Sequence, residues 1–140
     1  TMSTLRELPG DLSKWKEKDL FLYLKGCCYP DLEKSRKQMA RWDCYSVSST
    51  HRIELKCRTK HYDTLMIERP KYESMMLKCN DHLDIPMYIN STPEGVYRFN
   101  LYNFSPVWET QYHSKTTEFS QKHKIPKEVA FLDVIDAEIL

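Results

Sequence analysis

Two carboxylates and a lysine have the most informative spacing in this 140-residue chain: Asp43, then Glu54 eleven residues later, followed by Leu55 and Lys56. Along an extended strand, Glu54 and Lys56 share one face and lie roughly 6 to 7 Å apart. Two carboxylates a few ångströms apart repel each other unless a cation bridges them. Oxygen ligands of this kind suit Mg²⁺ or Mn²⁺, and the main-chain carbonyl of Leu55 offers a third oxygen.

This set of residues suits phosphodiester hydrolysis. A bound divalent ion lowers the pKa of a water ligand, which attacks phosphorus, and it neutralises the charge that develops on the phosphate. Lys56 would hold or activate that water and stabilise charge on the phosphate. The competing interpretation is an exposed strand face with alternating charges, because Glu-x-Lys alone is a frequent pattern.

The elements that must position these residues are two strands joined by a short turn. Residues 41–47 are typical of a strand, 48–50 of a turn, and 51–58 of a second strand with strict alternation. The alternation sets Ile53, Leu55 and Cys57 on one face and the charged residues on the other. An antiparallel hairpin would bring Asp43 beside Glu54.

Helices are expected on either side of this hairpin. The first follows a cap at Asp11 or Ser13 and ends near Gly26. Pro70 suits the first turn of the second, with Tyr72, Met75, Met76 and Cys79 as its buried face. The remaining expectations are a helical or irregular segment over 31–40, a short apolar stretch at 65–67, strands at 87–89 and 96–101 around a turn at 92–95, and a last strand at 129–134.

Composition fits a single domain over residues 1–140. Hydrophobic residues make up 41% and aromatic residues 12%, which is too many for a disordered chain. No apolar run approaches the ~20 residues of a membrane span, and the N-terminus lacks a signal-peptide pattern. We therefore expect a cytoplasmic protein without membrane association. Five cysteines without a C-x-x-C pair argue against a disulfide scaffold or a zinc site.

Charge is concentrated around the proposed site. The formal net charge of +1 excludes a globally basic DNA-coating protein. Residues 33–60, however, hold eight Lys or Arg against three acids, a net +5 that leaves −4 for the rest. This local excess favours a nucleic-acid partner; a basic strand edge that prevents aggregation is the alternative. DNA contacts are expected from Arg41, Arg52, Arg58, Lys60, Lys71 and Tyr72, although Tyr72 fits a core position equally well.

The pattern Asp43…Glu54-Leu55-Lys56 resembles the active-site signature of the PD-(D/E)xK nuclease superfamily. That superfamily includes restriction endonucleases, Holliday-junction resolvases and RecB-type exonuclease domains. The resemblance implies an α/β fold with a mixed sheet, the restriction endonuclease-like α-β-β-β-α-β core, over residues 11 to 101. It also implies a DNA endonuclease that depends on Mg²⁺ or Mn²⁺, with Asp43, Glu54 and Lys56 as catalytic residues. The small size is most similar to compact phage or mobile-element nucleases, which would act in the host cytoplasm if phage-encoded.

The chain departs from the family pattern before the first aspartate. Trp42, not proline, precedes Asp43. A Pro30-Asp31 pair does occur, but it lies 23 residues before Glu54 in a predicted turn. We therefore rank Asp31 below Asp43 as a ligand.

Two further family features can be compared with the chain. Many members use a glutamate of the first helix as an accessory ligand, for which Glu17 is the candidate and Asp19 and Glu33 are rivals. The RecB-type Gln-x-x-x-Tyr motif is absent, since residues 68–72 retain only the tyrosine. This absence argues against a RecB-like exonuclease.

Two alternatives to a nuclease stay open. One is a non-catalytic nucleic-acid-binding module of the same fold, and the other is an accessory interaction protein whose charges are solvated. The intact set of two acids and a lysine favours the nuclease. A small nuclease cuts both strands most simply as a two-fold dimer, so a homodimer is expected.

Overall fold

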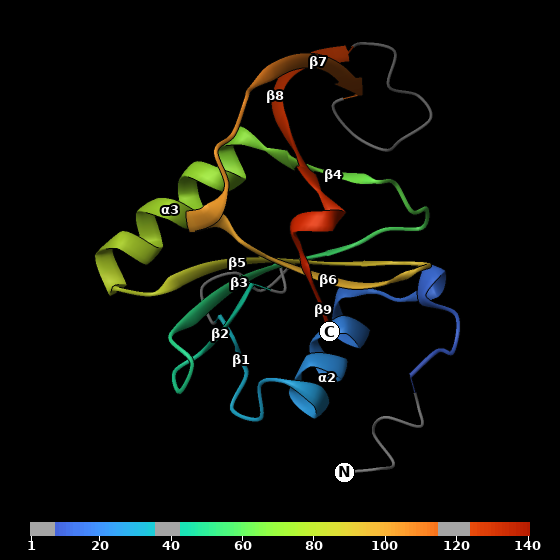
Figure 1. The fold of residues 1–140 in the computed structure, drawn as a ribbon, viewed down its shortest axis with the longest axis vertical. Coiled ribbons are helices and arrows are strands. Elements are labelled where there is room, and N and C mark those ends of the chain that lie inside the picture. The colour runs from blue at the N-terminus through green and yellow to red at the C-terminus, as the bar shows by residue number, and fades with distance from the viewer. Residues whose placement is uncertain (1–7, 36–42, 115–123) are drawn as a thin grey trace.

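The structure, a computed structural model, describes residues 8–35, 43–114 and 124–140 as two β-sheets with two α-helices (Figure 1). Helix α2 packs on strand β3 of the larger sheet, and helix α3 contacts strands of both sheets. The fold class is mixed α and β. No helix in the described ranges is long and apolar enough to cross a membrane.

The larger sheet, called the main sheet, has six strands in the described part of the chain. Their spatial order is β1 (Glu33–Lys34), β2 (Cys44–Ser46), β3 (His51–Cys57), β5 (Ile85–Thr92), β6 (Gly95–Asn100) and β9 (Glu138–Ile139). Strand β2 is antiparallel to both β1 and β3, whereas β5 runs parallel to β3. The parallel pair makes β3 an interior strand.

A second, small sheet has the order β4 (Thr64–Glu68), β8 (Lys124–Asp133) and β7 (Glu109–Ser114), all antiparallel. Strand β4 lies between β3 and α3 in the chain, so the small sheet begins inside the connection from β3 to β5. The sequence indicated only a short apolar stretch at β4 and the second half of β8, and it did not indicate β7.

Helix α2 (Glu17–Cys27) begins later than expected. Asp11 does cap a turn, because its Oδ1 accepts the Ser13 N–H at 2.9 Å, but that turn is the short 3₁₀ helix η1 (Leu12–Lys14). A second start follows at Lys16, whose N–H donates to Asp19 Oδ2 at 2.8 Å. The prediction of one continuous helix from the first cap was therefore wrong at its N-terminal end.

Helix α3 (Arg69–His82) has Pro70 in its first turn, as predicted. Met75 and Cys79 are buried, and the helix ends at Leu83 in a left-handed conformation with φ of 58°. Short 3₁₀ helices follow at η2 (Leu101–Asn103) and η3 (Val134–Asp136). The two helices and the main-sheet strands, in the order α2, β1, β2, β3, α3, β5, reproduce the expected α-β-β-β-α-β core, with β4 of the small sheet inserted between β3 and α3. Strand β1 lies within the segment that was expected to be helical or irregular.

Two hydrophobic clusters cover the two faces of the main sheet. The first lies between α2 and the sheet and includes Leu20, Leu24, Ile53, Leu55 and Ile89. The second lies between the opposite face, α3 and the small sheet, and includes Leu65, Met75, Tyr88, Phe99 and Leu132. Because β3 alternates, Ile53 and Leu55 enter the first cluster while Glu54 turns toward the second layer. The Glu54 carboxylate therefore lies on a strand in the middle of a sheet whose two faces are both covered.

A polar chain ties the C-terminal strand β9 to the start of β3. Arg98 donates to both carboxylate oxygens of Glu138, at 3.3 and 2.9 Å, and to the Tyr29 hydroxyl at 2.9 Å. The same hydroxyl lies within hydrogen-bond distance of Nδ1 of His51, at 2.7 Å. Burial and then the Arg98 charge lower the pKa of His51, and Glu138 only partly opposes them.

A pH-dependent stability follows from His51. The pKa of His51 is lower in the folded than in the unfolded chain, so the unfolded state takes up the proton first as pH falls. The contribution of His51 to the free energy of unfolding is therefore lost as pH falls below about 6.5. Replacing His51→Asn keeps a polar side chain that can hydrogen-bond to Tyr29 and removes the titration. Urea unfolding at pH 8 and pH 5 should show that wild type loses more stability on acidification than His51→Asn. Equal losses would contradict the assignment.

Candidate active site

Asp43 and Glu54 face each other across neighbouring strands of the main sheet. Strands β2 and β3 pair with Cys44 opposite Ile53, so continuing the register by one residue sets Asp43 opposite Glu54. The Ser35 N–H donates to the Asp43 carbonyl at 2.8 Å, which extends the β1–β2 pairing to this residue. The structure therefore brings together the two carboxylates that the sequence singled out.

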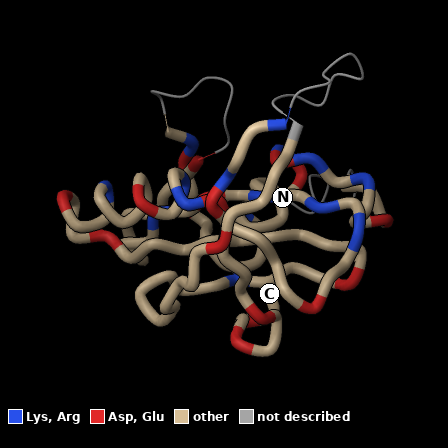
Figure 2. The backbone as a smooth tube through the Cα atoms, turned by 90° about the horizontal axis from the view of Figure 1, so that it is seen from above, with Lys and Arg blue, Asp and Glu red and all other residues tan. Residues whose placement is uncertain are grey.

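Both carboxylates line a pocket of about 210 Å³, called the main pocket. Its lining residues come from β3, the start of β2, the end of β4 and the part of α3 from Pro70 to Lys78. The charged and hydroxyl side chains around it are Ser35, Asp43, Arg52, Glu54, Glu68, Lys71, Ser74 and Lys78. Acids and cations are thus mixed in one concave site, and they are also interspersed along the backbone as a whole (Figure 2).

Glu54 is the most perturbed carboxyl of the site. Its side chain is only 13% exposed. The pKa of Glu54 is raised to about 7, first by burial and next by the hydrogen bond with Asp43 and the repulsion between the two carboxylates. The charge of Lys71 acts in the opposite direction and lowers this pKa. The Lys71 Nζ lies 3.2 Å from Glu54 Oε2. A carboxyl with a strongly raised pKa in a pocket is a frequent feature of functional sites.

A smaller hollow of about 80 Å³ adjoins the main pocket and shares Glu54, Glu68 and Lys71 with it. Its lining also includes Lys56 and, from the first turn of α2, Glu17. Lys56 is exposed to solvent and is not buried against apolar residues. The structure thus gathers Glu17, Glu54 and Lys56 around one hollow.

The rival carboxylates are held in local contacts. Asp31 accepts from Ser46 Oγ at 2.7 Å and from the Ser48 N–H at 2.9 Å, and these hydrogen bonds lower its pKa. Asp19 accepts the Lys16 N–H at the start of α2. Glu33 accepts from the Tyr45 hydroxyl at 2.8 Å. None of these three lines either of the two hollows.

The side chains expected to contact DNA have different environments. Arg52 lines the main pocket and pairs with Asp84 at 3.1 Å, and Lys60 is exposed. Arg58 is half-buried and lines the smaller hollow, where its guanidinium donates to Asn90 Oδ1, the Met66 carbonyl and the Tyr88 hydroxyl. The ranges that the structure describes do not include Arg41.

Tyr72 belongs to a ring cluster. Its ring packs edge-on against Phe104 and Trp108, with centroid distances of 6.1 and 5.5 Å. The side chain is half-buried and contacts the second hydrophobic cluster. This environment corresponds to the core alternative of the sequence analysis, and a DNA contact from Tyr72 stays a prediction.

Glu68 and Lys78 were not expected as site residues, and Lys71 was not expected to pair with Glu54. Glu68 lines both hollows and pairs with Lys127 of β8 at 3.1 Å. Lys71 and Lys78 are seven residues apart on α3, a spacing that places both on one helix face. This spacing was visible in the sequence, but which face meets the carboxylates depends on how α3 packs.

The donor set for a metal ion consists of two carboxylates. In the described part of the chain, no group of three or more His, Cys, Asp or Glu side chains is arranged to hold a metal. Mg²⁺ is commonly bound by one or two carboxylates together with waters and substrate phosphates. The facing pair of Asp43 and Glu54, with the Leu55 carbonyl between Glu54 and Lys56, fits that mode of binding.

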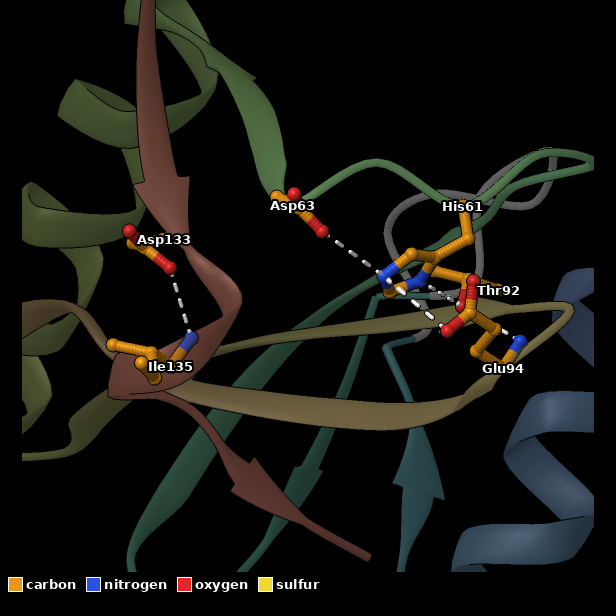
Figure 3. Close-up of polar contacts among 6 residues, drawn as sticks. All are labelled: His61, Asp63, Thr92, Glu94, Asp133 and Ile135. Carbon is orange, nitrogen blue, oxygen red and sulfur yellow. Dashed lines mark hydrogen bonds and ion pairs between the residues drawn. The ribbon is translucent and has the colours of Figure 1, made fainter.

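A separate polar cluster surrounds His61, in the loop after β3 (Figure 3). Its Nδ1 lies 2.9 Å from Thr92 Oγ1, and its Nε2 lies 3.9 Å from Asp63 and 3.8 Å from Glu94. The Glu94 N–H donates to the same Thr92 hydroxyl at 3.1 Å. These contacts tie the loop to the β5–β6 turn, and His61 lines neither hollow.

The chain was compared with protein families, curated proteins and solved structures. No protein-family model matches the chain, and no curated protein matches it. The structure is similar to that of Hjc, a Holliday junction resolvase from the archaeal hyperthermophile Archaeoglobus fulgidus. The two are 13% identical, the match covers 84% of this chain and 87% of that chain, and the TM-score is 0.49.

The facing carboxylates predict a stability gain on substitution. Since the pKa of Glu54 is raised in the folded state, its contribution to stability is present at low pH and is lost as pH rises through about 7. Asp43→Asn removes the repulsion. In EDTA, thermal unfolding should show a higher Tm for Asp43→Asn than for wild type at pH 8, and a smaller difference at pH 5.5. A difference that does not grow with pH would show that the two carboxylates do not repel.

Proposed function

We propose that this chain is a divalent-metal-dependent DNA nuclease whose metal ion is held by Asp43 and Glu54. The observation that carries the proposal is the facing pair of carboxylates in the main pocket, with Glu54 nearly buried. A purely structural role would not favour two like charges in contact, because their repulsion and desolvation destabilise the fold. A divalent cation removes that repulsion.

The roles of the side chains follow from their positions. When bound, a divalent ion supplies a water of lowered pKa and neutralises charge on the phosphate. Asp43 and Glu54, with the Leu55 carbonyl, would orient this ion. Lys56, exposed beside the smaller hollow, would hold the attacking water and offer a positive charge to the phosphate. Glu17, in the same hollow, would be the accessory ligand.

Substrate binding would use the cations around the two hollows. Arg52 and Lys71 line the main pocket, and Lys60 follows β3 on the surface. Lysine and arginine bind phosphates independently of base sequence, so affinity should fall steeply with salt. We propose DNA as the substrate and endonuclease action as the activity. A homodimer would present two such sites for the two strands of a duplex.

One observation favours a second candidate, a non-catalytic nucleic-acid-binding module. Glu54 is already neutralised in part by the ammonium of Lys71, at 3.2 Å. If this ion pair were permanent, Glu54 would be unable to serve as a metal ligand, and the cations of the site would serve binding alone. Cleavage assays distinguish the two candidates directly.

Cleavage should depend on metal and on three side chains. Plasmid, linear duplex, single-stranded and branched DNA are incubated with Mg²⁺, Mn²⁺ or EDTA. Wild type should cut at least one substrate only with metal. Asp43→Asn, Glu54→Gln and Lys56→Ala should each reduce the cleavage rate by about 10²-fold or more, because each removes an interaction with the reacting groups.

Asp81→Asn is the matched control, since Asp81 is an exposed carboxylate at the C-terminal end of α3. This variant should cleave at the wild-type rate. If all three variants still cleave DNA at the wild-type rate, Asp43, Glu54 and Lys56 are not the catalytic residues. Binding to every substrate without cutting would support the non-catalytic module.

A further inference from the structure

We infer that Lys71 is an exchangeable counter-cation of the site: it neutralises Glu54 while no divalent ion is bound, and the arriving ion releases its ammonium toward a substrate phosphate. The inference rests on the proposed function, because it concerns the same carboxylates. It assigns Lys71 a positioning role that is separate from that of Lys56 on β3.

The contact between Lys71 and Glu54 joins a mobile cation to a fixed anion. Glu54 is on an interior strand and its side chain is 13% exposed, whereas the Lys71 side chain is 36% exposed. Lysine carries its charge on a flexible four-carbon stem and can move it by rotation alone. Of the two partners, Lys71 is therefore the one that can leave.

Lys71 also occupies an unfavourable place on its own helix. It is in the first turn of α3 (Arg69–His82), where the partial positive charge of the helix N-terminus disfavours a cation. The ion pair with Glu54 offsets that repulsion. When a divalent ion takes over Glu54, the helix terminus and the ammonium together form a positive site, and both groups favour a phosphate.

The other carboxylates of the two hollows leave the released ammonium without an internal partner. Asp43 and Glu17 would bind the same ion as Glu54, and Glu68 is already paired with Lys127 of β8 at 3.1 Å. Arg58 illustrates the contrasting case, since its guanidinium is locked by hydrogen bonds to Asn90, Met66 and Tyr88. A phosphate from the substrate is thus the anion that Lys71 would meet.

The test measures Mn²⁺ affinity without DNA, by calorimetry at pH 8.5. Lys71→Met removes the competing cation and should bind Mn²⁺ more tightly, on the order of tenfold, while cleaving DNA more slowly than wild type. Lys71→Arg retains the cation and should not gain affinity. Lys14→Met is the matched control, because Lys14 is exposed in η1 and lines neither hollow, and it should leave the affinity unchanged.

A measurement on the wild-type protein covers the case in which Lys71→Met fails to fold. An amine-reactive reagent followed by mass spectrometry reports the accessibility of each lysine. Labelling of Lys71 should increase when Mn²⁺ is added, and labelling of Lys127 should not. Labelling of Lys71 that Mn²⁺ leaves unchanged would overturn the inference.

Failure of this inference can be told from failure of the proposed function. Asp43→Asn and Glu54→Gln should abolish specific Mn²⁺ binding, and if they do not, the proposed metal site itself is wrong. If they do, while Lys71→Met binds Mn²⁺ no more tightly than wild type, the site stands and only the exchange of Lys71 is wrong. Tighter Mn²⁺ binding by Lys71→Met together with slower cleavage supports the exchange, because a merely structural residue would weaken both.

Discussion

The repulsion between Asp43 and Glu54 is the constraint on which the site depends. The two carboxylates are brought into contact by the β2–β3 pairing, whose register is set by the tight turn at residues 47–50. Burial then increases the cost of that contact and raises the pKa of Glu54. In the absence of a metal ion, the protein limits this cost through the ammonium of Lys71. A carboxyl whose pKa is raised in this way within a pocket is a frequent feature of functional sites.

The burial of Glu54 comes from the topology of the main sheet. Strand β5 runs parallel to β3, and the connection between them passes through β4 and α3. Without that crossover β3 would be an edge strand, and Glu54 would be solvated with an ordinary pKa. The small sheet also supports the start of α3, since Glu128 of β8 pairs with Arg69 at 3.2 Å. The part of the fold outside the α-β-β-β-α-β core therefore helps to hold the site.

Much of the local structure was predictable because it depends on local patterns. The alternation in residues 51–57 identified β3 and its two faces, and Pro70 marked the start of α3. The pairing of Asp43 with Glu54 followed from one short turn. Strand β7 and the full length of β8 were not predictable in the same way, because they are stabilised by pairing between segments far apart in the chain. The split start of α2 was missed because a 3₁₀ turn and an α-helix share the same cap signal.

The sequence by itself determined which residue types could do chemistry and which faces of β3 they occupy, because strand alternation and a short hairpin are local properties. The tertiary structure alone decided which cations meet those carboxylates. Lys71 and Glu68 come to the site only through the packing of α3 and the small sheet. Arg58 is as basic as Lys71, but its guanidinium is held by hydrogen bonds within the protein. Contacts between distant segments depend on how layers pack, and no local pattern encodes that packing.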